Sequence, residues 1–127
     1  MLKFVSFFKL IYTKMGISKK YSIIGGGIIM NILKKEEGKS LILELEGRLD
    51  TMTSKQLEEE VNTSFENKES VLLNFEKLEY LSSAGLRVIL LAQKKMNKQG
   101  EMKITNVNET VREVFEITGF MDILTIE

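Results

Sequence analysis

From Leu41 to the end of the chain, short apolar runs alternate with longer stretches whose apolar residues recur every three or four positions. Residues 71–75 are apolar and bounded by polar residues, which indicates a central strand covered on both faces. Residues 102–107 are predicted as another strand, and a helical pattern precedes each of these two strands. Helices that connect strands in this order imply right-handed crossovers between parallel neighbours. The alternation therefore predicts an α/β fold.

Two further apolar runs, at residues 31–33 and 41–45, flank the polar turn 34–39. This pattern predicts a β-hairpin that adds an antiparallel edge to the sheet. The order along the chain is then ββαβαβα, and the apolar tail at 120–126 is a candidate for a short last strand. The expected fold is a single α/β domain with a mostly parallel mixed sheet of four to five strands and helices packed on it.

The ends of the first and last helices have recognisable capping residues. The first helix is predicted at residues 54–67, with apolar positions four apart and with Thr51 and Thr53 as N-cap candidates. The last helix follows Asn108, a good N-cap residue, and Gly119 closes it. Because the chain contains no Pro, its turns depend on Gly, Asn and capping hydroxyls.

The first 29 residues differ in composition from the rest. They hold five lysines and no acidic residue, and Lys9 and Lys14 interrupt any run long enough for a membrane span or a signal-peptide core. We predict a basic N-terminal extension at residues 1–29, poorly ordered rather than held on a membrane surface, ahead of a domain at residues 30–127. The Gly triplet shortly before Met30 also fits a purine-rich ribosome-binding sequence, which would make residues 1–29 an upstream mis-start.

Two missing residue types and the charge balance exclude several classes of function. The chain has no Cys and no His, which excludes thiol chemistry, disulfides, imidazole bases and the commonest zinc ligands. The whole chain has 18 basic and 18 acidic residues, so residues 30–127 keep 13 basic and 18 acidic residues and are net −5. An acidic domain argues against direct nucleic-acid binding, which depends on cationic contacts with phosphates. No metal, cofactor or catalytic residue is predicted.

The middle helix begins near Ser82 or Ser83 and stops at Gly100, which suits a left-handed C-terminal cap. In one interpretation the serine hydroxyls only cap the first turn, by accepting a hydrogen bond from a free amide. In the other, Ser83 lies outside the carboxyl ends of the strands, where open α/β sheets bind their ligands. A phosphate is tolerated there, because a helix N-terminus favours negative charge.

Two neighbours of these serines bear on the choice. Gly85 is a poor helix former, and its missing side chain would leave room for a partner or a phosphate to approach the backbone. A nucleophilic serine enzyme is not supported, because the nearest basic residue is Arg87, whose guanidinium cannot act as a base.

Several segments, taken in order, resemble the anti-sigma factor antagonists of the STAS domain family: LEGRLD at 45–50, VLLNF at 71–75, YLSSAGLRVIL at 80–90, and the stretches 100–107 and 118–120. The resemblance covers residues 30–127. It implies a cytoplasmic bacterial switch protein, not an enzyme, that binds an anti-sigma factor and so frees a sigma factor for transcription. The implied partner is a serine kinase of the ATP-binding, histidine-kinase-like type, which phosphorylates Ser83, and a serine phosphatase reverses the step.

The resemblance also implies a partner-binding surface, formed by Asp50, Ser82, Ser83, Ala84, Gly85 and Arg87. The family usually has Asp where this chain has Ser82, and Ser or Thr where it has Ala84. Asp50 has a second interpretation, as a plain helix-capping carboxylate. Phosphorylation adds about −1.5 to −2 charge to a surface already acidic from Asp50 and Glu79. We expect the complex to weaken by about 100-fold or more while the domain stays folded.

Two other functions remain open at this point. A STAS module can act as a constitutive adaptor without phosphorylation, for example as a subunit with a transporter ATPase, and would use the same edge of the sheet. A small-ligand or nucleotide-binding module is the third hypothesis, although residues 30–127 contain no Gly-rich phosphate motif.

Overall fold

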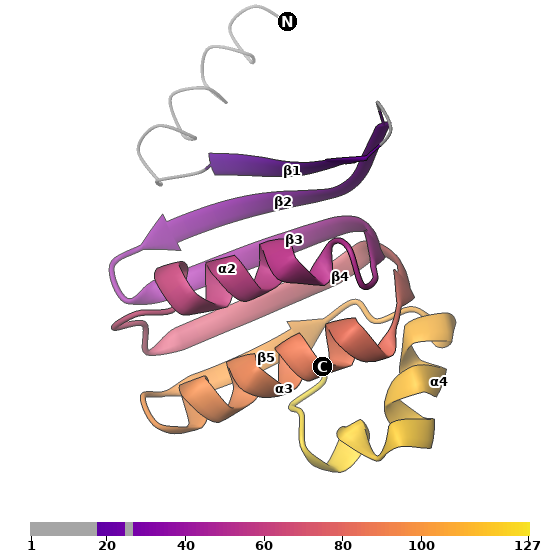
Figure 1. Ribbon diagram of the computed structural model, residues 1–127. Helices are drawn as coiled ribbons and strands as arrows, with labels where there is room; N and C mark the ends of the chain where they lie inside the picture. The colour runs from indigo at the N-terminus through magenta and orange to yellow at the C-terminus, as the bar shows by residue number, and fades with distance from the viewer. Residues whose placement is uncertain (1–17, 25–26) are drawn as a thin grey trace, which may run out of the picture.

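The computed structural model describes residues 18–24 and 27–127, with side chains from Met30 onward. Figure 1 shows the strands and helices of this part, coloured along the chain. In chain order they are β1 (Ser18–Ile24), β2 (Gly27–Glu37), β3 (Ser40–Leu49), α2 (Ser54–Ser64), β4 (Ser70–Leu81), α3 (Ser83–Asn97), β5 (Glu101–Thr105), α4 (Glu109–Thr118) and the 3-10 turn η1 (Phe120–Asp122).

One five-stranded sheet carries the fold, in the spatial order β1-β2-β3-β4-β5. The pairs β1–β2 and β2–β3 are antiparallel, whereas β3–β4 and β4–β5 are parallel and are connected through α2 and α3. In the tail, Ile126 forms a single parallel bridge to Ile104 of β5. The predicted α/β fold, with its mixed sheet and its hairpin at residues 31–45, is confirmed.

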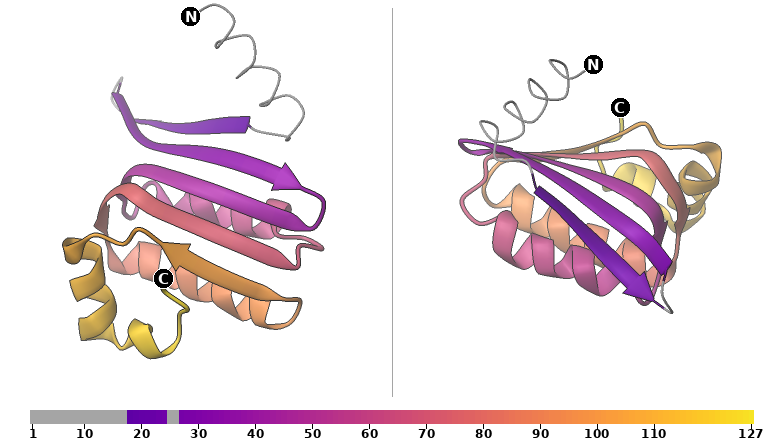
Figure 2. Two further views of the ribbon diagram at one scale, coloured as in Figure 1. Left: turned by 180° about the vertical axis from the view of Figure 1, so that it is seen from behind. Right: turned by 90° about the horizontal axis from the view of Figure 1, so that it is seen from above.

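Both long helices lie on the same face of the sheet, as the view from above in Figure 2 shows for α2 and α3. Val71, Leu73 and Phe75 of β4 point beneath the helices and are almost completely buried, whereas Leu72 lies on the opposite face and is half-buried. The prediction that this strand is covered on both faces is therefore wrong for the described residues, because its second face carries no helix and leaves Leu72 half-buried. Leu72 pairs directly with Ile42 of β3, so neighbouring strands bring apolar side chains together on the helix-free face.

β4 is also longer than the predicted strand at residues 71–75, since it continues to Leu81. Beyond Phe75 the buried positions are Leu78 and Leu81, so the simple alternation is lost. The register between β3 and β4 shifts at two points along the same stretch. Irregularities of this kind bend a strand and interrupt its period of two, which explains why the pattern did not predict its full length.

The helix ends follow the predicted capping with small differences. α2 ends three residues before the predicted residue 67, and Asn67 itself takes a left-handed φ of 62°. At the start of α4, Asn108 accepts a hydrogen bond from the Val111 amide at 2.8 Å, and at its end Gly119 is left-handed with φ of 79°. The predicted caps of α4 are thus confirmed.

Gly100 does not have the predicted role. The C-cap residue of α3 is Lys98 in a right-handed conformation, and Gly100 is not among the glycines with positive φ. Gly100 is instead required by a close approach of two backbones, because a Cβ at this position would overlap the carbonyl of Glu69. The neighbouring amide of Glu101 donates to that same carbonyl at 3.0 Å, which joins the loops that precede β4 and β5.

The predicted domain boundary at Met30 lies inside β2, which begins at Gly27 and pairs with β1 on its outer side. β1 rather than β2 is therefore the edge strand of the described sheet. The rest of the predicted extension, residues 1–17 and 25–26, lies outside the described residues, and a translation start at Met30 stays a prediction.

A buried polar cluster links α2 to β2. The Ser64 hydroxyl donates to Oε2 of the fully buried Glu60 at 2.6 Å, and Lys34 of β2 donates to Ser64 Oγ at 3.0 Å. The Lys34 ammonium is also 3.6 Å from Glu60 Oε2. A buried carboxylate of this kind needs such partners, so the cluster fixes where α2 sits on the sheet.

We predict that Gly100→Ala lowers the free energy of unfolding by more than about 3 kcal/mol, because the Glu69 backbone cannot move away without breaking its bond to Glu101. Urea denaturation of the purified protein measures the loss. Gly38→Ala is the matched control: Gly38 has φ of 59° but open space around it, so only the conformational penalty of about 1–2 kcal/mol applies. A smaller loss for Gly100→Ala than for Gly38→Ala would contradict the backbone contact.

Candidate functional site

The predicted site residues meet at the carboxyl ends of the parallel strands, at the right-hand edge of Figure 1. Leu49 ends β3 and Leu81 ends β4, and the two residues are paired across the sheet. Asp50 and Ser82 follow them directly, and the Ser82 amide donates to the Leu49 carbonyl at 2.9 Å. The loop after β3 and the first turn of α3 therefore lie side by side, as the sequence predicted.

The two serines have different environments. Ser82 is the N-cap of α3: it is half-buried, and its Oγ accepts a long hydrogen bond of 3.5 Å from the Gly85 amide. Ser83 is the first residue of the helix, and it is exposed. Within the described residues, its hydroxyl has no hydrogen-bond partner. The capping interpretation thus holds for Ser82, and Ser83 is left with a free alcohol at the mouth of the helix.

Asp50 acts as a capping carboxylate for the loop before α2. Its Oδ1 accepts hydrogen bonds from the amides of Met52 and Thr53, at 3.0 and 3.1 Å. Thr53 occupies the N-cap position of α2 but does not cap it with its side chain, which corrects one expectation. The fully buried Thr53 hydroxyl instead donates to the Arg48 carbonyl at 2.7 Å and accepts from the Asp50 amide at 2.9 Å. The loop before α2 is therefore fixed by hydrogen bonds with two side chains, those of Asp50 and Thr53.

The prediction that the missing side chain of Gly85 leaves room for a partner or a phosphate is wrong. Gly85 is buried, and a Cβ there would lie 2.7 Å from Leu81 Cδ1 and 2.8 Å from Leu49 Cγ. The missing side chain thus lets α3 pack closely on the ends of β3 and β4, rather than opening its backbone to a partner. The exposed positions in the first turns of α3 are Ser83 and Arg87, while Ala84 is half-buried.

Arg87 reaches across to the neighbouring helix. Its Nη2 lies 3.0 Å from Oε2 of Glu58 in α2, in an ion pair that is largely solvent-exposed on the arginine side. Farther along α3, Lys95 pairs with Glu66, in the segment directly after α2, at 3.3 Å. One ion pair therefore joins α3 to α2 and a second joins it to the segment after α2, and the first is one helical turn from Ser83.

Sequence reasoning missed two exposed side chains at this edge. Met52, at the tip of the loop held by Asp50, is 59% exposed. Tyr80 is 37% exposed, and the Arg48 guanidinium lies 4.2 Å from the centre of its ring. Because Leu49 and Leu81 point beneath the helices, Arg48 and Tyr80 one position earlier lie on the helix-free face. One signal in the sequence could have indicated Arg48 and Tyr80: each stands directly before the buried leucine that ends its strand.

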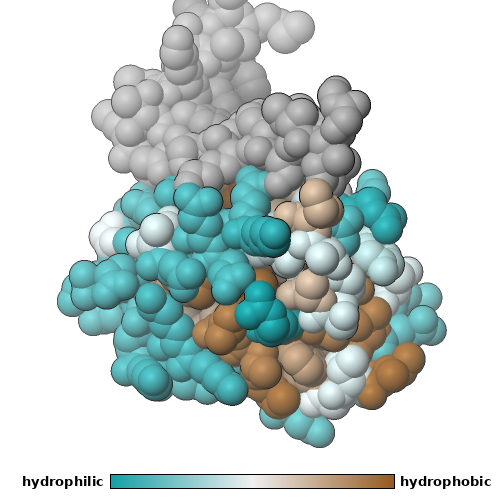
Figure 3. Space-filling view, viewed as in Figure 1, coloured by the Kyte–Doolittle hydropathy of each residue, from teal (hydrophilic) through white to brown (hydrophobic). Residues whose placement is uncertain are grey.

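The helix-bearing face is mixed in character. Figure 3 shows mainly hydrophilic side chains over α2, with hydrophobic patches toward α3 and α4. Exposed apolar residues on these two helices include Leu91 at 40% and Ile117 at 85%.

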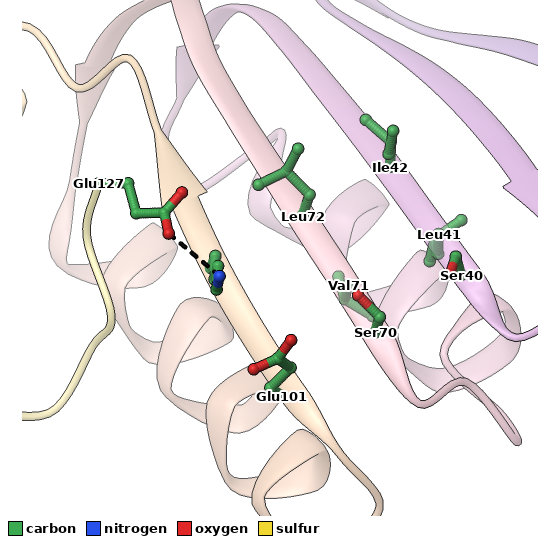
Figure 4. Close-up of a pocket in the computed structure, with 9 residues that line it drawn as sticks. Ser40, Leu41, Ile42, Ser70, Val71, Leu72, Glu101 and Glu127 are labelled. Atoms are coloured by element: carbon green, nitrogen blue, oxygen red, sulfur yellow. Dashed lines mark ion pairs between the residues drawn. The ribbon is translucent and has the colours of Figure 1, made fainter.

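A shallow hollow lies at the opposite end of the sheet from Ser83. Figure 4 shows it on the helix-free face, where Ile42 and Leu72 point outward; its volume is about 370 Å³. Lys103 and Glu127 form an ion pair of 3.1 Å at its rim. The hydrogen bond to Glu127, together with the charges of Glu127 and Glu101, raises the pKa of Lys103 above its ordinary value. The hollow is separate from the predicted site residues.

Metal-ligand clusters and membrane-spanning helices are both absent from the described residues. In this part of the chain, no group of three or more acidic side chains is arranged to hold a metal ion. None of its helices combines the length and the hydropathy of a membrane span.

Comparison with known proteins gives one consistent result. The STAS domain model matches residues 31–127. The chain is 41% identical over 88 residues to the candidate anti-sigma factor antagonist BtrV of Bordetella bronchiseptica, covering 68% of this chain and 76% of that protein. It is 33% identical over 89 residues to the anti-sigma F factor antagonist of Paenibacillus polymyxa, with the same two coverages of 68% and 76%.

Solved structures agree on the fold. The anti-sigma factor antagonist SpoIIAA in its unphosphorylated form superposes with a TM-score of 0.66 at 22% identity, covering 76% of this chain and 87% of that one. The phosphorylated form of SpoIIAA from Bacillus superposes with a TM-score of 0.58 at 18% identity, over 87% of this chain and 91% of that one.

We predict that Thr53→Val destabilises the domain by about 1–3 kcal/mol, because valine leaves the Asp50 amide and the Arg48 carbonyl without their buried partner. Thr51→Val, at an exposed position of the same loop, is the control and should change stability by less than about 0.5 kcal/mol. Thermal or urea unfolding of the two variants checks both values. Equal stabilities would mean that the Thr53 hydroxyl does not hold the loop.

Proposed function

Because the chain belongs to the STAS domain family of anti-sigma factor antagonists, we propose that it binds an anti-sigma factor and thereby releases a sigma factor for transcription. It acts by binding rather than by catalysis. The observation that carries the proposal is the exposed Ser83 alcohol, which lies at the first turn of α3 beside a loop held rigidly by Asp50 and Thr53.

We propose that Ser83 is the switch residue, and that the partner is a serine kinase that carries ATP. The Ser83 oxygen attacks the γ-phosphorus, the bond from that phosphorus to the ADP oxygen breaks, and the hydroxyl proton passes to a base of the kinase. A serine phosphatase reverses the step by transferring the phosphoryl group to water, which restores the alcohol and releases inorganic phosphate. The position supports this chemistry, since nothing within the domain competes for the Ser83 hydroxyl.

The phosphate should disturb the complex far more than the fold. Ser83 is exposed and begins a helix, so a dianion there gains from the helix dipole and needs no burial. A partner surface shaped around a neutral alcohol must instead accommodate about −1.5 to −2 charge next to Asp50 and Glu79. SpoIIAA, whose phosphorylated form has been solved, offers a precedent for a phosphate on this fold.

The proposed partner surface keeps all the predicted residues but gives them different roles. Ser83 and Arg87 are exposed and can contact a partner directly, while Asp50 and Ser82 shape the two adjacent loops through their hydrogen bonds. Gly85 contributes the close packing of α3 beneath the surface, and the half-buried Ala84 lies beside it in the sequence. Met52 joins this set as an exposed apolar side chain, of the kind that anchors protein interfaces.

We place this activity in the bacterial cytoplasm, where sigma factors and their kinases work, and in a domain that corresponds to residues 30–127. No direct contact with DNA or with a membrane is part of the proposal. β1 and the first residues of β2 precede this range, and the intact mass of the native protein decides between a start at Met1 and a start at Met30.

We predict that the cognate kinase labels the wild-type protein but not Ser83→Ala. Incubation with radiolabelled ATP and phosphopeptide mapping measure the transfer. Ser82→Ala is the matched control, because it removes the adjacent hydroxyl and leaves Ser83 in place, so it should still be labelled. Equal labelling of wild type and Ser83→Ala would remove Ser83 from the mechanism.

We also predict that Ser83→Asp raises the Kd for the anti-sigma factor by at least about 10-fold, since even one negative charge at this point opposes the interface. Ser82→Asp is the control: aspartate is an equally good N-cap residue, so its affinity should stay within about 3-fold of wild type. Isothermal titration calorimetry gives both constants. An unchanged affinity for Ser83→Asp would favour the constitutive adaptor function instead.

A further inference from the structure

Arg87 and Ser83 are neighbours on the surface of α3. They are four residues apart within the same helix, a spacing that brings side chains together across one turn, or about 6 Å of axial rise. Helical side chains lean toward the N-terminus, so the guanidinium of Arg87 extends back toward the level of Ser83. Both side chains are exposed.

In the unmodified protein this guanidinium is occupied by another group. Arg87 Nη2 is 3.0 Å from Glu58 Oε2, and the side chains of Arg87 and Glu58 are 60% and 32% exposed. An ion pair this open to water contributes little stability and exchanges partners readily. A phosphate carries more charge than a carboxylate and matches the fork of a guanidinium, so it competes strongly for the same arginine.

We propose that Arg87 is a positioning residue for the phosphate on Ser83, and that phosphorylation makes Arg87 exchange Glu58 for the phosphate. This inference rests on the proposed function for the presence of the phosphate. It assigns a new role to Arg87, within the chain itself rather than toward the partner. Of the other charged groups at this edge, Asp50 and Glu79 are acidic and cannot take this role, and the Arg48 guanidinium lies on the helix-free face, 4.2 Å from the centre of the Tyr80 ring.

The exchange would extend the effect of one modification over two helices. The phosphate becomes partly neutralised and held in one orientation by its own helix. Glu58 is released, so α2 gains an unpaired negative charge on the side that faces α3. The ion pair between Lys95 and Glu66, near the other end of α3, is not changed. A partner that contacts α2 as well as Ser83 would therefore meet two changes.

The test uses the full chain with phosphoserine installed at position 83 by genetic encoding, so that no kinase or partner is required. The second pKa of the phosphate, about 6 for free phosphoserine, is measured by ³¹P NMR titration at low salt. We expect Arg87→Gln to raise this pKa by on the order of 0.5, because the ionised phosphate loses its cation. Arg87→Lys, which keeps the charge but not the fork, should give an intermediate value.

Lys95→Gln is the matched control. It removes another paired cation from α3, about three turns along the helix from Ser83, and should leave the phosphate pKa unchanged. In the wild-type phosphoprotein the Arg87 Nε–H resonance should follow the phosphate titration. The proposal is overturned if Arg87→Gln leaves the phosphate pKa unchanged, or if Lys95→Gln raises it equally. Since no partner is present, this result is independent of whether phosphorylation alters partner binding.

Discussion

The parallel pairing of β3 with β4 is the constraint on which the rest of the molecule depends. It continues to the last residue of each strand, Leu49 beside Leu81, so the two loops that follow begin at the same height. α3 then packs on these leucines through Gly85, whose hydrogen in place of a side chain permits the contact. Moving either strand by one residue would separate Asp50 from Ser82 and turn the leucines to the wrong face. The arrangement of the site residues therefore depends on the register between β3 and β4.

At the ends of these two strands, neighbouring polar residues have different structural roles. Ser82 caps the helix and is partly withdrawn from water, whereas the hydroxyl of Ser83 is exposed and makes no hydrogen bond within residues 30–127. Asp50 and Thr53 use their oxygens on the backbone of their own loop. A charge added to Ser83 therefore meets a surface already set in place, and its effects are directed outward or along α3. This separation lets a modification alter recognition while the core stays intact.

The sequence predicted those features that depend on local chemistry. Strand and helix alternation, the capping by Asn108 and Gly119, and the place of Asp50 and Ser82 at the same edge of the sheet follow from propensity and from the geometry of parallel sheets. The errors concern contacts between distant segments. Gly100 was assigned to a helix cap because no local pattern shows the Glu69 carbonyl above it. Likewise, Arg87 and Glu58 are 29 residues apart, and only the packing of α3 against α2 brings them together.

The tail of the chain offers a practical consequence. Glu127 donates its amide to the Ile104 carbonyl at 2.9 Å and pairs with Lys103, so the last residue is fixed at the outer side of β5. Its side chain lies at the hollow on the helix-free face of the sheet (Figure 4), whereas Ser83 begins a helix that covers the other face. A fluorescent tag joined after Glu127 would leave the molecule away from the switch. Partner binding could then be followed with a reporter that does not obstruct it.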